Sequence, residues 1–370
     1  MSVKIRLIKW FDDVFGRLLV VMGRALPYKE LEVPVRRILV IRPGGIGDAL
    51  LLLPLIKSIK LKNPTLHLTL LAEKRNSAVF SMCHFIDCVF CYDKYGELCH
   101  ALEASYDAVI DSEQWYRLSA VIAKCTGAAI RVGFASNERS YLFTDTIPYR
   151  FDVHEAINFN NLLTPIKDYL NDPQLTFDNL IDIPADATKS AELLLGETGH
   201  SSFVVLFPGG SVSEKQWGAE NFSYLVERLD AEGLPIVVIG GANELLTSSV
   251  VLSKAQGINL AGKTSFHETA AVIAKAAVVV SGDSGVLHLA TTLGKPTVSM
   301  FGPSDATKWA PRGKQHVVLN KALYCSPCSW FGQIPPCPYG VRCMTEISVD
   351  EVEQAVLTLL EKNKPRQQMP

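Results

Sequence analysis

Three short segments combine glycine with residues that can bind anions or transfer protons, and each directly follows an apolar run. They are Pro43–Asp48, Phe207–Lys215 and Ser281–His288. Glycine lets the backbone approach a ligand closely, and the N–H groups at the start of a helix attract anions. Such segments can hold a phosphate or diphosphate, with a carboxylate or imidazole nearby for acid–base work.

In the first segment, Gly44, Gly45 and Gly47 precede Asp48 in a turn that opens a helix expected over 49–60. The spacing departs from the dinucleotide fingerprint G-x-G-x-x-G with an acid about 20 residues later, which disfavours an NAD dehydrogenase. Two interpretations of Asp48 remain open. It is a general base held in the turn, or it is an ordinary carboxylate that caps the helix or complements its dipole.

The other two segments offer backbone donors and one cation. Their candidate binding residues are Gly210, Ser211 and Lys215 in the second segment and Asp283, Ser284, Gly285 and His288 in the third. Lys215 follows its turn closely enough to reach a phosphate held there. His288 shares a helix face with Ser284, although a lone histidine on a helix is often structural. Together the segments predict a site for a nucleotide diphosphate.

Alternating apolar runs and helix-length stretches must position these segments. In the first half, strands are expected at 36–42, 66–72, 88–92, 106–112, 129–134 and 143–149, and a helix follows near 154–170. A polar break then covers 171–200, and its last part, 185–200, is expected to be helical. The pattern then restarts, with strands at 202–208, 235–241, 258–262, 276–282 and 295–302. This order predicts an α/β protein with two doubly wound, Rossmann-like halves. Ligands bind at the carboxyl ends of such strands, so a central cleft is expected between the halves.

A length of 370 residues also predicts two domains. We expect an amphipathic helix over 1–30, an N-terminal Rossmann-like domain over 31–180 and a C-terminal Rossmann-like domain over 181–370. The 36 basic and 38 acidic residues leave a net charge of −2, which provides no general attraction for nucleic acid. A hydrophobic content of 48% excludes a mostly disordered chain.

Residues 3–24 carry a helical stripe of apolar side chains and five basic residues. The stripe consists of Leu7, Ile8, Phe11, Val14, Phe15, Leu18, Leu19 and Met22. The uncharged run is far shorter than the ~20 residues of a membrane span. One interpretation is an interfacial helix on an anionic membrane, with Trp10 and Phe11 at headgroup depth. The other is a helix that packs on its own domain, and both remain open.

Nine cysteines and no signal-peptide pattern indicate a reducing, cytoplasmic location. The late cysteines Cys325, Cys328, Cys337 and Cys343 read C-x2-C-x8-C-x5-C. Four thiolates could form a tetrahedral metal site. However, the spacing departs from two C-x2-C pairs, which favours reduced thiols or one labile disulfide. No metal or other cofactor is therefore assigned.

Several ordered motifs resemble family 9 glycosyltransferases, the ADP-heptose:lipopolysaccharide heptosyltransferases. They include ILVIRPGGIGDALLLL, LFPGGSVSEKQWGAENFSYL and SGDSGVLHLATTLGKPTVSMFGPSD, and the resemblance extends over about residues 36–360. It implies a GT-B fold, in which the N-terminal domain binds the acceptor and the C-terminal domain binds the nucleotide-sugar donor. Attack on the anomeric carbon from the face opposite the leaving diphosphate would invert its configuration. No carboxylate cluster with Mg²⁺ spacing is evident in the sequence, which favours a metal-independent enzyme. The enzyme would move a heptose or related sugar from an ADP-sugar to a lipopolysaccharide core or lipid A acceptor at the inner face of the cytoplasmic membrane.

The resemblance also implies roles for individual residues. Asp48 matches the general base, Lys215 the contact to the donor phosphates, and Glu244 the acid near the donor ribose. The run from Asp283 to His288 matches the diphosphate site. Some heptosyltransferases have two hydroxyl residues where Gly210-Ser211 stand here, which puts one phosphate contact in doubt. Two alternatives remain: a nucleotide-sugar 2-epimerase of the same fold, and a non-catalytic nucleotide-binding scaffold at the membrane.

Overall fold

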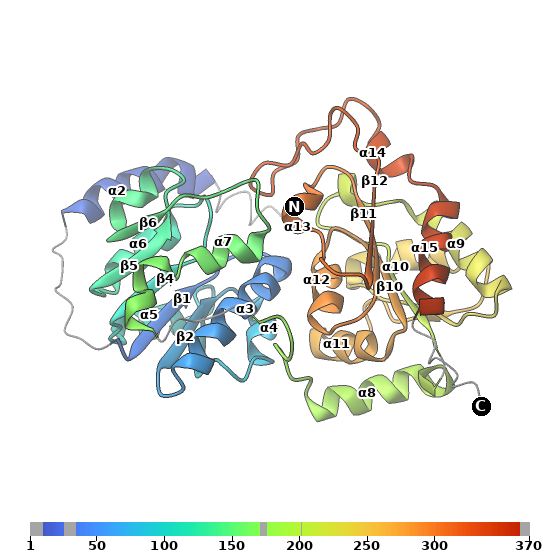
Figure 1. Cartoon of the computed structure of the whole chain (residues 1–370), viewed down its shortest axis with the longest axis horizontal. Coiled ribbons are helices and arrows are strands. Elements are labelled where there is room, and N and C mark those ends of the chain that lie inside the picture. Colours follow the sequence, from blue (N-terminus) through green and yellow to red (C-terminus); the bar gives the residue numbers. More distant parts are fainter. Residues whose placement is uncertain (1–9, 26–34, 171–175, 201, 363–370) are drawn as a thin grey trace. The chain divides into compact units, whose positions relative to one another are not determined.

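The computed structural model describes residues 10–25, 35–170, 176–200 and 202–362. The chain divides into two compact units, Met1–Asp182 and Ile183–Pro370, here called the first and second unit. Each unit contains a six-stranded sheet in which neighbouring strands pair in parallel (Figure 1). Helices lie between successive strands, as expected for doubly wound α/β folds.

The sheet of the first unit has the strand order β3-β2-β1-β4-β5-β6. Its strands are β1 (Arg37–Ile41), β2 (His67–Ala72), β3 (Cys88–Cys91), β4 (Ala108–Asp111), β5 (Ile130–Phe134) and β6 (Asp145–Ile147). The central strands are continuous apolar runs because helices cover both faces of a parallel sheet. The order reverses between β1 and β4, where Ile41 pairs with Asp111 at the carboxyl ends. This pair of strand ends is the topological switch point of the first unit.

Helices of the first unit cover the sheet through apolar contacts. They include α3 (Ile46–Lys62), α4 (Ser77–Ser81), α5 (Glu97–Glu103), α6 (Leu118–Cys125) and α7 (Glu155–Asn161). The prediction of one continuous helix over 154–170 was wrong. The segment contains two helices, because α7 ends at Asn161 and a separate 3₁₀ helix covers Thr164–Tyr169. Pro165 explains the break, since it donates no N–H and its ring clashes with the carbonyl four residues earlier.

The N-terminal helix packs on the first unit through small and polar residues. A π-helical turn, Asp12–Gly16, leads into α2 (Arg17–Arg24), which contacts α6. The buried Asp12 carboxylate accepts backbone N–H groups of Arg117 and Leu118 at 2.7 and 2.8 Å, at the start of α6. Farther along, Val20 is buried and Gly23 lies against Leu142, so both contribute to the same packed face.

Most large apolar side chains of this helix are exposed, whereas Val20 is buried and Leu19 is half-buried. The exposed ones are Trp10, Phe11, Val14, Phe15, Leu18, Val21 and Met22. The predicted stripe is therefore a real face where the structure describes it, but the opposite face makes the contacts with the domain. Residues 3–9 of the predicted helix lie outside the described residues. Among the helices that the structure does describe, none combines the length and apolar character needed to cross a membrane.

The sheet of the second unit repeats the topology of the first, with the order β12-β11-β10-β7-β8-β9. Its strands are β7 (Val204–Phe207), β8 (Ile236–Val238), β9 (Ile258–Asn259), β10 (Val278–Gly282), β11 (Thr297–Phe301) and β12 (His316–Asn320). The edge strand β12 was not predicted, because it is only half-buried and its pattern is correspondingly weak. Here the order reverses between β7 and β10, where Phe207 pairs with Ser281.

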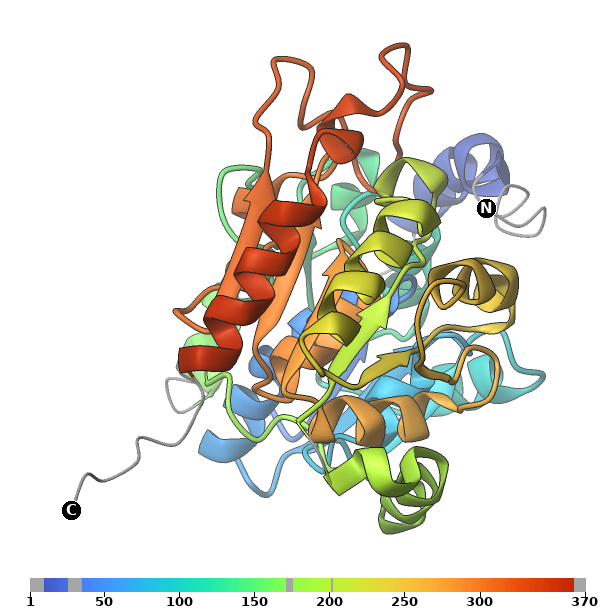
Figure 2. The ribbon, with the colours of Figure 1, turned by 90° about the vertical axis from the view of Figure 1, so that its right-hand side faces the viewer.

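Helices of the second unit pack on one another in two groups. They are α8 (Ala185–Leu195), α9 (Ala219–Ala231), α10 (Leu245–Val251), α11 (Phe266–Lys275), α12 (Gly285–Thr292), α13 (Ala306–Trp309), α14 (Arg342–Thr345) and α15 (Val349–Lys362). One group joins α15, α9 and α10, and Figure 2 shows α15 in red beside α9 in yellow-green. The other joins α8, α11 and α12. The ion pair between Lys275 and Glu192 at 2.9 Å contributes to the contact of α8 with α11.

A buried ion pair fixes the loop that follows β4. The side chains of Arg139 and Asp111 are both fully buried and hydrogen-bonded to each other. Arg139 also donates to the Glu113 carbonyl and to Ser119 Oγ. Because a buried charge is costly without its partner, this pair ties the end of β4 to the 3₁₀ helix Glu138–Leu142.

The exposed pair Arg150–Asp152 provides a control for this buried pair. We expect Arg139→Met to lower the free energy of unfolding by about 3–5 kcal/mol, because the fully buried Asp111 carboxyl loses its cation and hydrogen-bond partner. Arg150→Met should cost less than about 1 kcal/mol, since water screens exposed pairs. Urea unfolding followed by circular dichroism measures both, and similar losses in the two variants would contradict the assigned role of Arg139.

Candidate active site

The glycine-rich turn after β1 has the backbone shape that its sequence predicts. Gly44 has φ of +104°, a conformation that side-chain-bearing residues rarely adopt, and Gly45 precedes the first residue of α3. Asp48 lies in the first turn of α3, where its charge complements the helix dipole. A Cβ on Gly45 would lie 2.9 Å from Asp48 Oδ2, so the absence of a side chain leaves room for the carboxylate.

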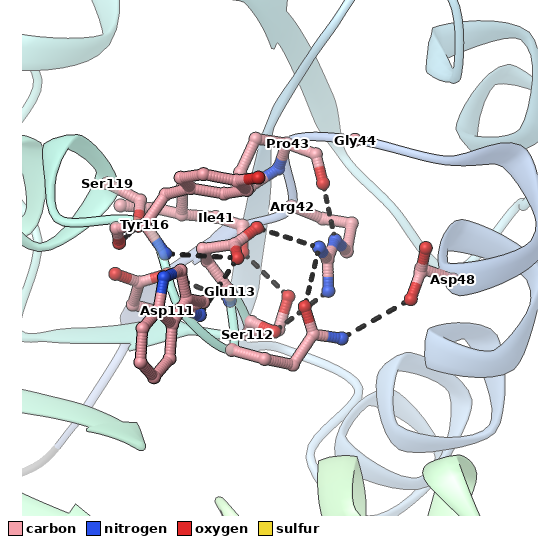
Figure 3. A network of polar contacts seen from close by, with 12 residues as sticks. Ile41, Arg42, Pro43, Gly44, Asp48, Asp111, Ser112, Glu113, Tyr116 and Ser119 are labelled. Atoms are coloured by element: carbon pink, nitrogen blue, oxygen red, sulfur yellow. Dashed lines mark hydrogen bonds and ion pairs between the residues drawn. The ribbon is translucent and has the colours of Figure 1, made fainter. Parts of the chain in front are cut away.

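Asp48 receives its hydrogen bond from another element rather than from the turn. Gln114 Nε2, from the loop after β4, donates to Asp48 Oδ1 at 3.3 Å (Figure 3). In the described part of the chain, no backbone N–H of the turn donates to this carboxylate. The capping interpretation of Asp48 is therefore limited to its interaction with the helix dipole. The carboxylate is half-buried and has a fixed neighbour.

Arg42 joins the two loops of this switch point. Its guanidinium donates to the Pro43 and Ser112 carbonyls at 2.7 and 2.8 Å and to Glu113 Oε2 at 3.0 Å (Figure 3). The nitrogen that binds Glu113, Nη2, also donates to Gln114 Oε1 at 3.3 Å. The turn after β1 and the loop after β4 are thus held together by one buried cation.

The corresponding switch point of the second unit contains Lys215, Asp283 and His288. Lys215 Nζ lies 2.6 Å from Asp283 Oδ2, and His288 Nε2 lies 3.8 Å from Asp283 Oδ1. Burial alone would raise the pKa of Asp283. The charges and hydrogen bonds of Lys215 and His288 outweigh it and hold the pKa well below the usual range of aspartate. The carboxylate is therefore ionised at neutral pH and orients the Lys215 ammonium and the His288 imidazole.

Backbone geometry explains why Lys215 reaches this position. A Cβ on Gly282 would lie 2.7 Å from the Lys215 carbonyl oxygen, so the end of β10 must be glycine for the two segments to pack. The neighbouring Trp217 is buried and donates its indole N–H to the Ile347 carbonyl at 2.8 Å. These contacts fix the backbone on which Lys215 is carried.

The N-terminus of α12 lies directly after Asp283. Ser284 caps it, because its Oγ accepts the N–H of Leu287 at 3.2 Å and pairs with Ser281 Oγ at 2.7 Å. Gly285 is the first residue of the helix, where backbone N–H groups have no acceptor within the helix. The structure thus brings the sequence-predicted residues Asp283, Ser284 and Gly285 together at one helix start beside Lys215. Free backbone N–H groups at a helix start are suited to an anion.

Glu244 lies across the ends of β7 and β8. Its Oε2 accepts the N–H of Gly241 at 2.8 Å, and its side chain fills the space that a Cβ on Gly209 or Gly240 would need, within 2.7 and 2.6 Å. The turn at Gly210 and Ser211 follows β7, with Ser211 exposed. Glu244 is thus held at the same edge of the sheet as the helix start of α12.

The late cysteines are all free thiols, and among the described residues no group of three or more His, Cys, Asp or Glu side chains is arranged to hold a metal ion. Cys343 is buried, and a Cβ on Gly302 would lie 2.9 Å from its Sγ. Burial raises the pKa of Cys343, and the neighbouring cysteines add to this effect, so the thiol form is favoured.

The fold and the two switch-point sites define an α/β protein of the two-domain GT-B class. The family model of glycosyltransferase family 9 (heptosyltransferase) matches residues 95–333. The chain belongs to this family and is a glycosyltransferase. It is similar to lipopolysaccharide heptosyltransferase 3 of Escherichia coli, with 24% identity over 290 residues that cover 72% of this chain and 83% of that protein.

Solved structures of the same fold include two glycosyltransferases. The family 9 glycosyl transferase from Veillonella parvula aligns with a TM-score of 0.76 and 22% identity, over 90% of this chain and 100% of that one. The E. coli ADP-heptose lps heptosyltransferase II aligns with a TM-score of 0.73 and 19% identity, over 89% and 100%. These likenesses support the GT-B fold deduced from the two sheets.

Sequence reasoning found Asp48, Lys215 and the start of α12, but it missed Arg42, Gln114 and their partners. A signal was present, because the polar run Asp111–Gln114 follows a buried strand and therefore stands at a sheet edge. What the sequence did not reveal was that β4 would lie beside β1.

We expect Lys215→Met to lower the free energy of unfolding of the ligand-free protein by about 2 kcal/mol or more at pH 7, because the buried Asp283 loses its closest cation. The folded-state pKa of Asp283 is lowered, so the stability from this pair is present above the unfolded pKa of about 4 and lost as the pH falls through the folded value. The difference in the free energy of unfolding between Lys215→Met and the wild-type protein should therefore become smaller at acidic pH. Urea unfolding at pH 7 and at lower pH measures this change.

Lys254→Met is the matched control, since Lys254 forms an exposed ion pair with Glu227 at 3.5 Å in the same unit. Its loss should stay below about 1 kcal/mol. A pH-independent loss in Lys215→Met would argue against the role of its charge.

Proposed function

We propose that this glycosyltransferase moves a heptose from ADP-heptose to a sugar hydroxyl of a lipopolysaccharide core or lipid A acceptor, with inversion at the anomeric carbon. The observation that carries the proposal is the half-buried carboxylate of Asp48, held by Gln114 at the switch point of the first unit. The names of the E. coli relatives, lipopolysaccharide heptosyltransferase 3 and ADP-heptose lps heptosyltransferase II, support the donor and acceptor class.

Asp48 serves as the general base. It takes the proton from the acceptor hydroxyl as the oxygen attacks the anomeric carbon from the face opposite the departing ADP. General-base assistance of this kind contributes typically 10²–10⁴-fold, roughly, to the rate. The acceptor binds at the turn of Gly44, Gly45 and Gly47, whose missing side chains leave the carboxylate accessible.

The second unit binds the donor. The diphosphate lies at the start of α12, where Ser284 and Gly285 present backbone N–H groups, and Lys215 supplies the opposing charge as ADP departs. Asp283 and His288 hold Lys215 and the helix start in place, while Gly210 and Ser211 add donors after β7. Glu244 receives the ribose hydroxyls. Because these groups supply the positive charge that the leaving group needs, we propose a metal-independent reaction without a cofactor.

We expect Asp48→Asn to lower kcat by about two orders of magnitude or more while the affinity for ADP changes little, because the amide keeps the size but cannot accept the proton. Release of ADP from ADP-heptose, measured with and without a lipid A-core acceptor, reports the turnover. Asp168→Asn, at an exposed position of the same unit, is the control and should behave like wild type.

The same assay separates the alternatives. Conversion of the donor into an isomeric ADP-sugar, without acceptor and without net release of ADP, would indicate a 2-epimerase. ADP binding with no turnover in the wild-type protein would indicate a non-catalytic scaffold. Release of a nucleotide from a different donor in a panel of ADP-, UDP- and GDP-sugars would replace ADP-heptose as the substrate.

We further propose that the enzyme acts at the inner face of the cytoplasmic membrane, on which the exposed face of α2 rests. Supporting this, Leu18, Val21 and Met22 are 57%, 64% and 62% exposed, while the opposite face is packed on the first unit. Arg17 and Arg24 flank these side chains, and Lys4, Arg6 and Lys9 precede them in the sequence. Apolar residues with flanking cations suit an anionic lipid surface, where a lipid-linked acceptor is embedded.

We expect the double variant Val21→Glu, Met22→Glu to reduce binding to vesicles of phosphatidylcholine and phosphatidylglycerol at least about tenfold, because two apolar contacts are replaced by repelled charges. Co-sedimentation measures the bound fraction. Leu245→Glu, Leu246→Glu on α10 is the matched control and should bind like wild type. If the wild-type protein does not bind anionic vesicles, the membrane proposal is overturned, whereas the assignment of Asp48 is unaffected.

A further inference from the structure

The side chain of Gln114 lies between two carboxylates and one guanidinium. Its Nε2 donates to Asp48 Oδ1 at 3.3 Å and to Glu155 Oε1 at 2.9 Å, and its Oε1 accepts from Arg42 Nη2 at 3.3 Å. The reverse orientation of the amide would turn its carbonyl toward both carboxylates. The three partners therefore fix which end of the amide faces Asp48.

Each partner of Gln114 is itself held in place. Glu155, fully buried at the start of α7, accepts the Tyr149 hydroxyl at 3.0 Å and the Asn158 amide at 3.2 Å. Arg42 is spread over the Pro43 and Ser112 carbonyls and the Glu113 carboxylate. Gln114 is only 8% exposed, and its partners Arg42 and Glu155 hold its amide on two sides. Its hydrogen bond can therefore fix the position of the Asp48 carboxylate.

The charges around this amide come from four directions. Arg42 at the end of β1 is the cation, Glu113 comes from the loop after β4, Glu155 from α7 and Asp48 from α3. Tyr149 remains a protonated donor, because burial and the neighbouring carboxylates Glu155 and Asp48 raise its pKa strongly. A neutral residue at 114 separates two negative charges while donating a hydrogen bond to each of them.

We infer that Gln114 is the positioning residue for the catalytic base: it holds Oδ1 of Asp48 and leaves Oδ2, on the side of Gly45, to accept the proton of the acceptor hydroxyl. The inference rests on the proposed role of Asp48 as the base. Gln114 acts through Asp48 and is therefore a positioning residue rather than a catalytic one. Loss of the fixed position of a proton-accepting oxygen lowers the rate by roughly one to two orders of magnitude.

Two substitutions test this inference from opposite directions. Gln114→Leu keeps the volume but donates no hydrogen bond, and kcat should fall about 10- to 100-fold with an unchanged KM for the donor. Gln114→Glu keeps the shape but adds a negative charge between Asp48 and Glu155. Because a like charge favours the protonated form of Asp48, the acid limb of the profile of kcat/KM against pH should move upward by about one pH unit or more. Gln354→Leu and Gln354→Glu, on the exposed surface of α15, are matched controls that should change neither property.

A double-mutant comparison separates positioning from general support of the fold. If Gln114 acts through Asp48, adding Gln114→Leu to Asp48→Asn should not lower the residual rate further. A further tenfold loss, or an unmoved acid limb in Gln114→Glu, would overturn the inference. If Gln114→Leu fails to fold, the acid limb of Gln114→Glu still decides the question.

The outcome for Asp48 separates this inference from the proposed function. Normal turnover in Asp48→Asn would remove the base itself and the inference with it. An inactive Asp48→Asn beside a fully active Gln114→Leu would remove only the positioning role.

Discussion

The parallel pairing of β1 with β4, and of β7 with β10, is the constraint on which both candidate sites depend. In each sheet the chain leaves the first central strand toward one edge and later returns to add the next central strand on its other side. The two loops at their carboxyl ends therefore diverge to opposite sides and leave space between them. Asp48 and Gln114 meet in the first unit for this reason, and Lys215 and Asp283 meet in the second, across 66 and 68 residues of sequence.

The two switch points use opposite electrostatic designs. In the first unit, the buried guanidinium of Arg42 binds the Glu113 carboxylate and the Gln114 amide, and the same amide donates to the carboxylates of Asp48 and Glu155. In the second unit, one buried carboxylate, Asp283, faces Lys215 and His288, which places the Lys215 cation beside the positive end of α12. One topology thus places a half-buried carboxylate in one domain and a cation beside a helix start in the other. This arrangement suits the proposed glycosyl transfer, which needs a proton acceptor and a site for a diphosphate leaving group.

Local patterns in the sequence were sufficient for the central strands and for the turns that follow them. Gly44, Lys215 and Ser284 could be found because each lies within a few residues of an apolar run that predicts a buried strand. Gln114 and Arg42 were missed because their roles depend on which strands become neighbours. The edge strand β12 escaped prediction for a different reason: solvent covers part of it, so apolar side chains no longer mark its full length.

The N-terminal segment shows a further limit of periodicity. Within the described residues most of the apolar stripe is an exposed face, and the contact with the domain is made by the opposite face. Asp12, Gly16 and Gly23 make that contact together with Val20, and apart from Val20 their small or polar side chains carry no hydrophobic signal. A helix can pack closely through such residues because two backbones approach where side chains are absent, and a buried carboxylate can complete the start of a neighbouring helix.

The Asp12 carboxylate also caps α6, so the N-terminal helix is joined directly to the first unit and not through a flexible linker. A flexible tether only raises the local concentration of a domain near the surface that holds it. A helix joined to the domain through a buried cap transmits orientation as well, so any surface that the exposed face rests on sets the tilt of the first sheet. The direction in which the ends of β1 and β4 open is then fixed by a contact made on a different part of the unit.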